Sequence, residues 1–159
     1  MTLVLTEETV MRQRLVAEAQ SWIGTPYISN GLVKGKRGGT DCAMFILGVY
    51  QAVGLIPADF DPRPYPAQWH VHRTEEVYVR HVLGWAKEML GPPGRAPKPG
   101  DVVMFKIGHV HAHGAIITEW PNVIHAMGGA KVMPDDVSKS TTGKRALWHV
   151  PQRFFSFWG

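Results

Sequence analysis

The hydrophobic pattern of this 159-residue chain changes at Gly100, and this change constrains the fold more than any other feature. Before Gly100, apolar residues recur at helical spacing, as in Met11, Leu15, Ala19 and Trp22. After it, short apolar runs separated by turn residues are typical of strands. Because the helices precede the strands and do not alternate with them, the sequence predicts an α+β fold with a mostly antiparallel sheet.

Three helices are expected before Gly100. Thr6 is a suitable N-cap for the first helix, and Gly24 is a suitable stop. The second helix should begin at or near Cys42 and end at Gly54. A third helix should follow a cap at Thr74. Its expected apolar face comprises Val79, Val82, Leu83, Ala86 and Leu90.

The strands should form one sheet in the last third of the chain. They are expected at residues 101–106, 110–118 and 123–127, with shorter candidates at 131–133 and 146–150. Two proline-rich stretches, PADFDPRPYPAQW and GPPGRAPKPG, are expected to carry no helix or strand. The second could be a domain linker, but too little chain lies on either side for two good cores. Residues 1–159 are therefore assigned to a single domain.

The composition is that of a folded globular protein, since 45% of the residues are hydrophobic. The N-terminal MTLVLTEETVMRQR lacks the regions of a signal peptide, and no apolar run is long enough to span a membrane. We therefore expect a protein made in the cytoplasm without a signal peptide. The net charge of +4 is mild, and the nearest basic cluster, Lys34, Lys36 and Arg37, is short. A solvated basic surface is favoured over specific nucleic-acid binding.

Cys42 is the only cysteine, so it cannot form an intramolecular disulfide. It follows Asp41 at the expected start of the second helix. Free N–H groups and the partial positive charge there favour a thiolate and can stabilise a neighbouring oxyanion. Cys42 is thus either a nucleophile or, as most free cysteines are, a small buried apolar residue.

A thiol nucleophile needs a base, and histidine is the suitable type. The chain has eight: His70, His72, His81, His109, His111, His113, His125 and His149. Strand alternation would place His109, His111 and His113 on one face, and His125 could orient whichever is the base. A tight hairpin at Pro121-Asn122 would place His125 opposite Thr118 with the wrong parity, so a bulge or a different turn is required.

Two alternatives to a Cys-His pair remain open at these residues. The His-x-His-x-His pattern of 109–113 could bind zinc, although no cysteine pair and no His-Glu-x-x-His motif supports a zinc site. The histidines could also be ordinary strand residues. Tyr27, in the loop before Cys42, could donate to an oxyanion or simply pack on the core.

The order of motifs resembles the NlpC-type cysteine peptidases. WIGTPY, DC at a helix start, KPGDVVMF, HGAII and IHA follow one another between about Ala19 and Ala126. Each motif is weak alone, but five in order are specific. The resemblance implies a papain-like fold, with N-terminal helices packed on an antiparallel sheet and the nucleophile at a helix N-terminus. SWIGTPY and the aromatic C-terminal strand are most similar to the branch found in phage tails and gene-transfer agents.

The resemblance also implies roles for individual residues. Cys42 matches the nucleophile of the Asp-Cys motif, and His113 matches the base that begins the family's His-x-Gly/Ala strand. His125 matches the third polar residue, and its separation from His113 is similar to that in the family. Tyr27 matches a tyrosine near the oxyanion, and Asp41 is grouped with it as an oxyanion or substrate residue. His109 and His111 have no counterpart.

Two departures from the family pattern concern the substrate. Ala43 and Met44 follow the cysteine where the family has small residues and glycine, and the bulk of Met44 bears on substrate fit. The loop 31–39, which contains Lys34, Lys36 and Arg37, also differs from the usual glycine-aromatic sequence. It could contact an acidic peptide stem or be a solvated loop.

The function implied by the resemblance is hydrolysis of peptidoglycan stem peptides, at bonds between D-glutamate and a diamino acid, through a Cys-His-His triad and an acyl-enzyme. No metal or organic cofactor is expected. Phage tail proteins are candidate partners, and delivery in a virion would bring the enzyme to the cell wall. The alternatives are an amidase or acyltransferase of the same fold, and a tail-assembly or wall-binding module without catalysis.

Overall fold

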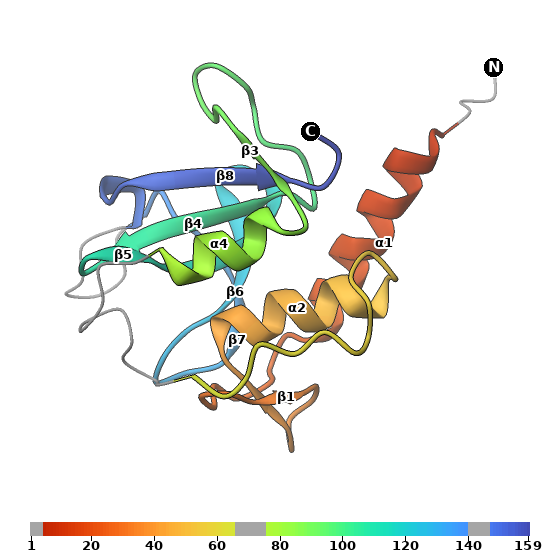
Figure 1. The fold of residues 1–159 in the computed structure, drawn as a ribbon, viewed down its shortest axis with the longest axis vertical. Helices are drawn as coiled ribbons and strands as arrows, with labels where there is room; N and C mark the ends of the chain where they lie inside the picture. The colour runs from red at the N-terminus through yellow and green to blue at the C-terminus, as the bar shows by residue number, and fades with distance from the viewer. Residues whose placement is uncertain (1–4, 66–75, 140–146) are drawn as a thin grey trace.

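A six-stranded antiparallel sheet with helices packed against it forms the body of the protein (Figure 1). The structure is a computed structural model that describes residues 5–65, 76–139 and 147–159. The strand order is β3-β8-β4-β5-β6-β7, and the pair β1-β2 forms a small separate sheet. The predicted α+β class, with helices first and a mostly antiparallel sheet, is confirmed.

The first two helices begin and end as expected. α1 spans Glu7–Ser21, and the side chain of Thr6 caps it by accepting a hydrogen bond from the Thr9 backbone N–H at 3.1 Å. α2 spans Cys42–Ala52, directly after its N-cap. Gly24 and Gly54 lie just beyond the two helices with φ of +95° and +81°, a conformation that glycine adopts without a steric cost.

The third predicted helix is shorter than expected. α4 spans Val77–Leu83 and ends before Gly84, and the chain then forms strand β3, Lys87–Met89. Helical periodicity of the apolar residues continues through this stretch, but Lys87–Met89 pairs with the C-terminal strand. Tertiary pairing therefore overrides local pattern here. The predicted cap at Thr74 lies outside the described residues.

The central strands follow the prediction, whereas the last one does not. β4 is Val102–Ile107, β5 is Val110–Glu119, β6 is Asn122–Ala126 and β7 is Val132–Asp136. The strand expected at 146–150 is wrong in its described part. Leu147–His149 is a short 3₁₀ helix, and strand β8 is Gln152–Ser156. Pro151 precedes β8, as expected of a residue that has no N–H to donate to a ladder.

The loop before α2 contains a two-stranded hairpin. Strand β1, Leu32–Val33, pairs with β2, Gly39–Thr40. Gly38 and Gly39 are packed so closely on the hairpin that a Cβ at Gly38 would lie 2.0 Å from the backbone oxygen of Val33. The glycines of this loop therefore allow the two backbone segments of the hairpin to pack closely together, and the chain continues from the hairpin to Asp41 and Cys42.

Apolar side chains fill both faces of the sheet. One cluster lies between the sheet and helices α1 and α2, and it includes Leu15, Phe45, Met104 and Phe155. A second lies on the opposite face and includes Phe105, Ile117 and Phe154. Both faces are therefore buried, which explains why β4 and β5 read as nearly continuous apolar runs instead of alternating ones.

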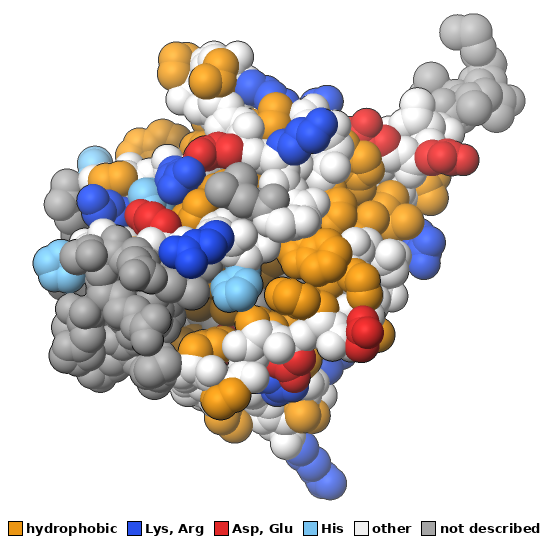
Figure 2. Space-filling model, viewed as in Figure 1, with side chains coloured by type: hydrophobic (Ala, Val, Ile, Leu, Met, Phe, Trp, Pro, Cys, Tyr) orange, Lys and Arg blue, Asp and Glu red, His pale blue; other side chains and the backbone are white. Residues whose placement is uncertain are grey.

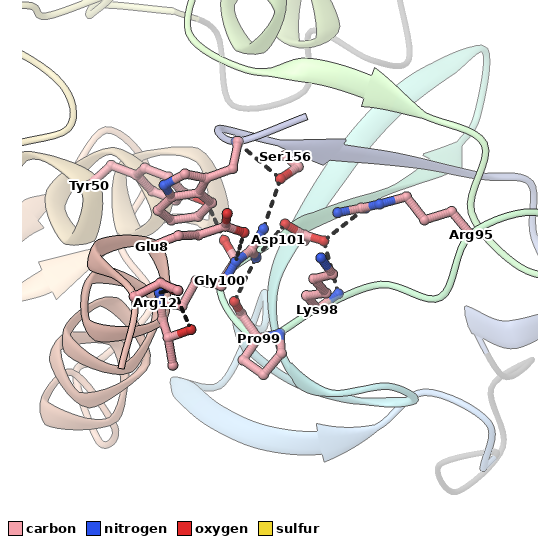
Figure 3. A network of polar contacts seen from close by, with 12 residues as sticks. Glu8, Arg12, Tyr50, Arg95, Lys98, Pro99, Gly100, Asp101 and Ser156 are labelled. Atoms are coloured by element: carbon pink, nitrogen blue, oxygen red, sulfur yellow. Dashed lines mark hydrogen bonds and ion pairs between the residues drawn. The ribbon is translucent and has the colours of Figure 1, made fainter. Parts of the chain in front are cut away.

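A buried ion pair joins α1 to the start of β4 (Figure 3). Arg12 is 6% exposed, and its guanidinium lies 2.8 Å from Asp101 Oδ1 and also donates to the Pro99 carbonyl at 2.9 Å. Asp101 accepts a second ion pair from Arg95 at 3.2 Å. These contacts satisfy buried charges that would otherwise be costly, and they fix α1 and the loop before β4 relative to the sheet.

Candidate active site

Cys42 is the first residue of α2, and its sulfur lies against β5. Its Sγ donates to the carbonyl oxygen of Ala112 across 3.6 Å, and the Gly114 backbone donates a hydrogen bond to Sγ. These two backbone groups belong to the residues on either side of His113. The fold therefore places the candidate nucleophile beside the candidate base, at residues separated by about 70 positions in the sequence.

Burial raises the pKa of the Cys42 thiol to about 12, and the nearby Asp41 carboxylate adds to this increase. Hydrogen bonds from the backbone of Gly114, Ala43 and Cys42 lower the pKa, as expected at a helix start, but they do not outweigh burial. The helix start therefore favours the thiolate, as expected, but burial has the larger effect. The resting form is a neutral thiol, which needs a base during the reaction.

His113, His125 and Asp135 form a chain of hydrogen bonds across three strands. His113 Nε2 lies 2.8 Å from His125 Nδ1, and His125 Nε2 lies 3.1 Å from Asp135 Oδ2. His125 is fully buried. Burial lowers the pKa of His113 to about 3 and that of His125 to about 4, so both imidazoles are neutral near pH 7.

A bulge near the β5–β6 turn brings the two histidines to one face. Ile117 pairs with Val123 and Glu119 pairs with Asn122, so Thr118 is an extra residue in β5. Without it His125 would have the wrong parity, as the sequence indicated. With it, Val123 and His125 share the face of Ile117 and of His113, and the predicted His113–His125 pair forms.

A second irregularity separates His113 from the other two histidines of its motif. His111 pairs with Lys106 and His113 pairs with Phe105, and neighbouring residues of β4 point to opposite faces. The prediction of one shared face for His109, His111 and His113 is therefore wrong. His111 instead contacts Glu76 at 2.9 Å, and His109 lies in the turn before β5.

The alternative of a zinc site finds no matching geometry among the described residues. His113 and His125 bind one another and Asp135, while His111 is directed to Glu76 on another face. Within 5–65, 76–139 and 147–159, no three His, Cys, Asp or Glu side chains are grouped so that they could hold a metal ion.

Asp41 has a structural task that its grouping with the oxyanion residues did not foresee. It is 3% exposed, and its Oδ1 accepts from the Met44 N–H at 2.8 Å, which caps α2. Its Oδ2 accepts from the Asn30 N–H at 2.7 Å and from the Tyr65 hydroxyl. These bonds hold three segments around Cys42, so Asp41 positions the helix start.

Tyr27 lies close to Cys42 and Asp41, as predicted from its place before the nucleophile. Its ring is partly buried against the core, and burial is the main cause that raises the pKa of its hydroxyl, with Cys42 and Asp41 adding to the effect. The hydroxyl therefore stays protonated and able to donate a hydrogen bond. Tyr27 both packs on the core and borders the site, so its two readings are compatible.

A cavity of about 700 Å³ opens beside Cys42 and is lined mainly by apolar and aromatic side chains. Its wall includes Tyr27, Cys42, His113 and Phe157. Figure 2 shows hydrophobic side chains gathered where α4 and α2 face each other. Met44, two residues after the nucleophile, is 1% exposed; it packs in the core and also forms part of the cavity wall.

The fold is shared with solved structures of NlpC/p60 domains. The NlpC/p60 domain of the peptidoglycan hydrolase SagA has a TM-score of 0.58 and 22% identity, over 89% of this chain and 96% of that chain. The P60 domain of an antigen of M. avium subspecies paratuberculosis has a TM-score of 0.60 and 13% identity, over 96% and 98%. The peptidoglycan hydrolase RipB of Mycobacterium tuberculosis has a TM-score of 0.58 and 16% identity, over 96% and 68%.

These likenesses establish the papain-like NlpC/p60 fold that the order of motifs predicted. No protein-family model matches the sequence, and none of the curated proteins matches it significantly. In the part of the chain that the structure describes, none of the helices has the length and hydrophobicity that crossing a bilayer requires.

Sequence reasoning missed Asp135 and Tyr65, which contact site residues directly. The strand predicted at 131–133 stops two residues before Asp135, although β7 continues to Asp136. His125 pairs with Met133 in β7, and Asp135 lies two residues further on the same face. A longer β7 would therefore have indicated Asp135. Tyr65 lies in a proline-rich segment without helix or strand, and no periodic signal could have placed it.

Proposed function

We propose that this protein is a cysteine peptidase that hydrolyses peptidoglycan stem peptides. The observation that carries the proposal is the contact of Cys42 Sγ with backbone groups on both sides of His113, whose imidazole is held by His125. A nucleophile, a base and a third group that orients the base are the elements of thiol hydrolysis. The NlpC/p60 fold supports the choice of a cell-wall substrate, because SagA and RipB are named peptidoglycan hydrolases.

The first half of the reaction forms an acyl-enzyme. As Sγ of Cys42 attacks the peptide carbonyl carbon, Nδ1 of His113 accepts the thiol proton, since thiol and imidazole are both neutral at rest. The carbonyl oxygen becomes an oxyanion, stabilised by the Cys42 backbone N–H at the helix start and by the Tyr27 hydroxyl. His113 then gives its proton to the leaving amine, the C–N bond breaks and a thioester remains.

The second half releases the product with the same groups. His113 accepts a proton from water as the water oxygen attacks the thioester carbonyl. The C–S bond breaks, the proton returns to the sulfur, and a carboxylic acid leaves. His125 accepts a hydrogen bond from His113 throughout and holds the ring in one orientation.

Mass spectrometry of purified muropeptides tests this function. Wild-type protein should cleave the stem peptide between D-glutamate and the diamino acid, and Cys42→Ala should abolish cleavage while circular dichroism shows an unchanged fold. His113→Ala should also be inactive, whereas His109→Ala, altered in the turn before β5, should retain nearly wild-type turnover. Equal cleavage by wild type and Cys42→Ala would contradict the proposal.

We also propose that the enzyme is made in the cytoplasm and reaches the wall in a phage-like tail, as its motifs suggest. Immunodetection of the protein in purified particles, together with co-purification of tail proteins, tests this route. Absence of the protein from particles would argue against tail delivery but would not bear on the proposed hydrolysis. A protein that is present in particles but whose Cys42 does not react with muropeptides or alkylating agents would instead be a non-catalytic tail or wall-binding module.

A further inference from the structure

We propose that the cavity between α2 and α4 binds a large hydrophobic acyl group and presents its carbonyl to Cys42. The site would then act on esters or amides of apolar acids, which extends its substrates beyond polar stem peptides. This inference rests on Cys42 as the nucleophile of the proposed function, but it does not depend on the peptidoglycan substrate.

The cavity wall is built from facing stripes of two helices. From α2 the wall takes Ala43, Ile46, Leu47 and Tyr50, from α4 Tyr78 and Val82, and from the turn after α4 Trp85. On each helix these residues recur every three or four positions, so they occupy one face. Cys42 lies at one end of the α2 stripe and Tyr50 at the other, a separation of about 12 Å along the helix axis.

Other segments add further apolar side chains to the wall. Ile56 and Phe60 come from the segment after α2, and Val102 and Phe157 come from the sheet side. The ring of Phe60 meets that of Trp85 edge to face, with centroids 5.2 Å apart. A volume of about 700 Å³ lies within the range of small-molecule sites, which bury apolar groups in this way.

The charge of the wall argues against an anionic group inside the cavity. The acidic and histidine side chains in the wall are Asp41, His81 and His113. None of the described residues that line the cavity is a lysine or an arginine. Asp41 is already bonded to Met44, Asn30 and Tyr65. Among the described residues of the wall, a carboxylate would therefore find no lysine or arginine to pair with, whereas an alkyl or aryl group would replace water at an apolar surface.

The chemistry needs no group beyond those already placed. Sγ of Cys42 attacks the ester carbonyl, the thiol proton passes to His113, and the departing alcohol takes that proton as the C–O bond breaks. The thioester carries the acyl chain in the cavity. Water then hydrolyses it to the carboxylic acid and restores the thiol.

Acylation of Cys42 by p-nitrophenyl esters of increasing chain length tests the inference. Release of p-nitrophenol and the mass of the acylated protein report the rate and the site. From acetate to octanoate, the second-order rate constant should increase about two- to fourfold for each added methylene that the cavity buries. Cys42→Ala should show no acylation with any ester.

Two tryptophan variants make the test specific to the cavity. Val82→Trp fills the wall of the cavity on α4, so it should remove the preference for octanoate while acetate still reacts. Val10→Trp changes an exposed position of α1 and should keep the preference. Equal rate constants for acetate and octanoate in the wild type would overturn the cavity assignment and leave the nucleophile standing. Failure of every ester to acylate Cys42 would overturn the nucleophile as well.

A second inference comes from the hydrogen-bond chain: we infer that Asp135 is a positioning residue that sets the tautomers of both histidines. It rests on the proposed roles of His113 and His125. The Asp135 carboxylate only accepts hydrogen bonds, so the proton of neutral His125 lies on Nε2. Nδ1 of His125 is then an acceptor, and the bond at 2.8 Å requires the proton of His113 to lie on Nε2. Nδ1 of His113 keeps its lone pair for the thiol proton.

Without Asp135 the opposite arrangement becomes available. His125 could carry its proton on Nδ1 and donate to His113, which would place the proton of His113 on Nδ1 and block its action as a base. Asp136, the next residue of β7, is a suitable control because its carboxylate accepts from Ser138 and has no bond to either histidine. Asp135→Ala and Asp136→Ala therefore remove equal groups from adjacent positions.

The ¹⁵N chemical shifts of labelled histidine read the tautomers directly and do not require turnover. In the wild type and in Asp136→Ala, Nδ1 of His113 should be unprotonated and Nε2 protonated. In Asp135→Ala the two forms should mix, and kcat should fall about tenfold or more with little change in KM. Unchanged shifts in Asp135→Ala would overturn the inference even if activity fell. A wild type that shows these tautomers but lacks hydrolysis would contradict the proposed function alone.

Discussion

At the scale of single residues, the site is a pair of neutral groups. Burial keeps the proton on Cys42 and off His113, so the two effects act in the same direction. An ion pair of thiolate and imidazolium would require the reverse. The reaction must therefore move the proton while the sulfur attacks, and the orientation of His113 matters more than the acidity of the thiol.

The pH dependence of Cys42 alkylation tests this neutral pair. Because the pKa of the thiol is raised to about 12, the rate of alkylation by iodoacetamide should rise continuously from neutral pH into the alkaline range without a plateau. His113→Ala should slow the reaction near neutral pH, since the thiol loses its base. A plateau that begins below neutral pH in the wild type would indicate a preformed thiolate and contradict the assignment.

The site residues differ in how far the sequence could predict them. Cys42 and His113 stand in local motifs, and a local pattern is enough to find them. The contact of His113 with His125 depends on the extra residue Thr118 in β5. Hydrophobic periodicity cannot predict the position of such a bulge, because the bulge shifts the strand register and changes which residues share a face. Asp135 depends on the register between β6 and β7, which is a property of the whole hairpin.

At the scale of elements, α1 is held by one buried ion pair in addition to its apolar face. Arg12 contacts Asp101 and the Pro99 carbonyl, and its guanidinium also lies 4.2 Å from the centre of the Trp158 ring. The helix therefore contacts the start of β4 and the C-terminal segment together. The first helix was predictable from its cap and its period, but the role of Arg12 was not, because a charged residue in an amphipathic helix is usually solvated.

Removing Arg12 should destabilise the fold. Arg12→Ala leaves the buried Asp101 carboxylate with Arg95 as its remaining ion-pair partner, and the free energy of unfolding should fall by about 3 kcal/mol. Urea unfolding followed by circular dichroism measures this loss. Arg14→Ala, at an exposed position of the same helix, is the matched control and should change stability by less than about 0.5 kcal/mol. Equal effects of the two substitutions would refute the role of the ion pair.

The elements that the sequence predicted incorrectly are β3 and β8, which pair with each other. Lys87–Met89 continues a helical pattern, and Gln152–Ser156 follows a 3₁₀ turn that has the composition of a short strand. β3 becomes a strand because β8 is beside it, and β8 is held between β3 and β4. Local propensity carries no information about such a partner more than 60 residues away.

At the scale of the whole molecule, two buried neutral histidines link stability to pH. The pKa of His113 is lowered to about 3 and that of His125 to about 4, whereas unfolded histidine titrates near 6.5. Below about pH 6.5 the unfolded chain therefore binds more protons than the folded chain. The stabilisation that comes from keeping the two histidines neutral is fully present above about pH 6.5, and it is lost as the pH falls toward the pKa values of the folded state.

Unfolding measured from about pH 7.5 to about pH 4.5 tests this linkage. Each histidine should contribute up to about 1.4 kcal/mol per pH unit to the decrease in the free energy of unfolding below about pH 6.5. His125→Gln removes one of the two groups and should make the decrease less steep. A stability that stays constant down to about pH 4.5 in the wild type would contradict the lowered pKa values.

The position of β8 has a consequence for the order in which the molecule can be completed. Strands β4 to β7 are successive hairpin neighbours and can pair as soon as they leave the ribosome, but β3 must wait, because its only described partner in the sheet is the strand made last. During synthesis, β3 therefore has no described strand to pair with until β8 is made. Phe157, which lines the cavity beside Cys42, directly follows β8, so the cavity wall is completed only when this segment is added, and a nascent chain without it cannot enclose a substrate as the finished protein does.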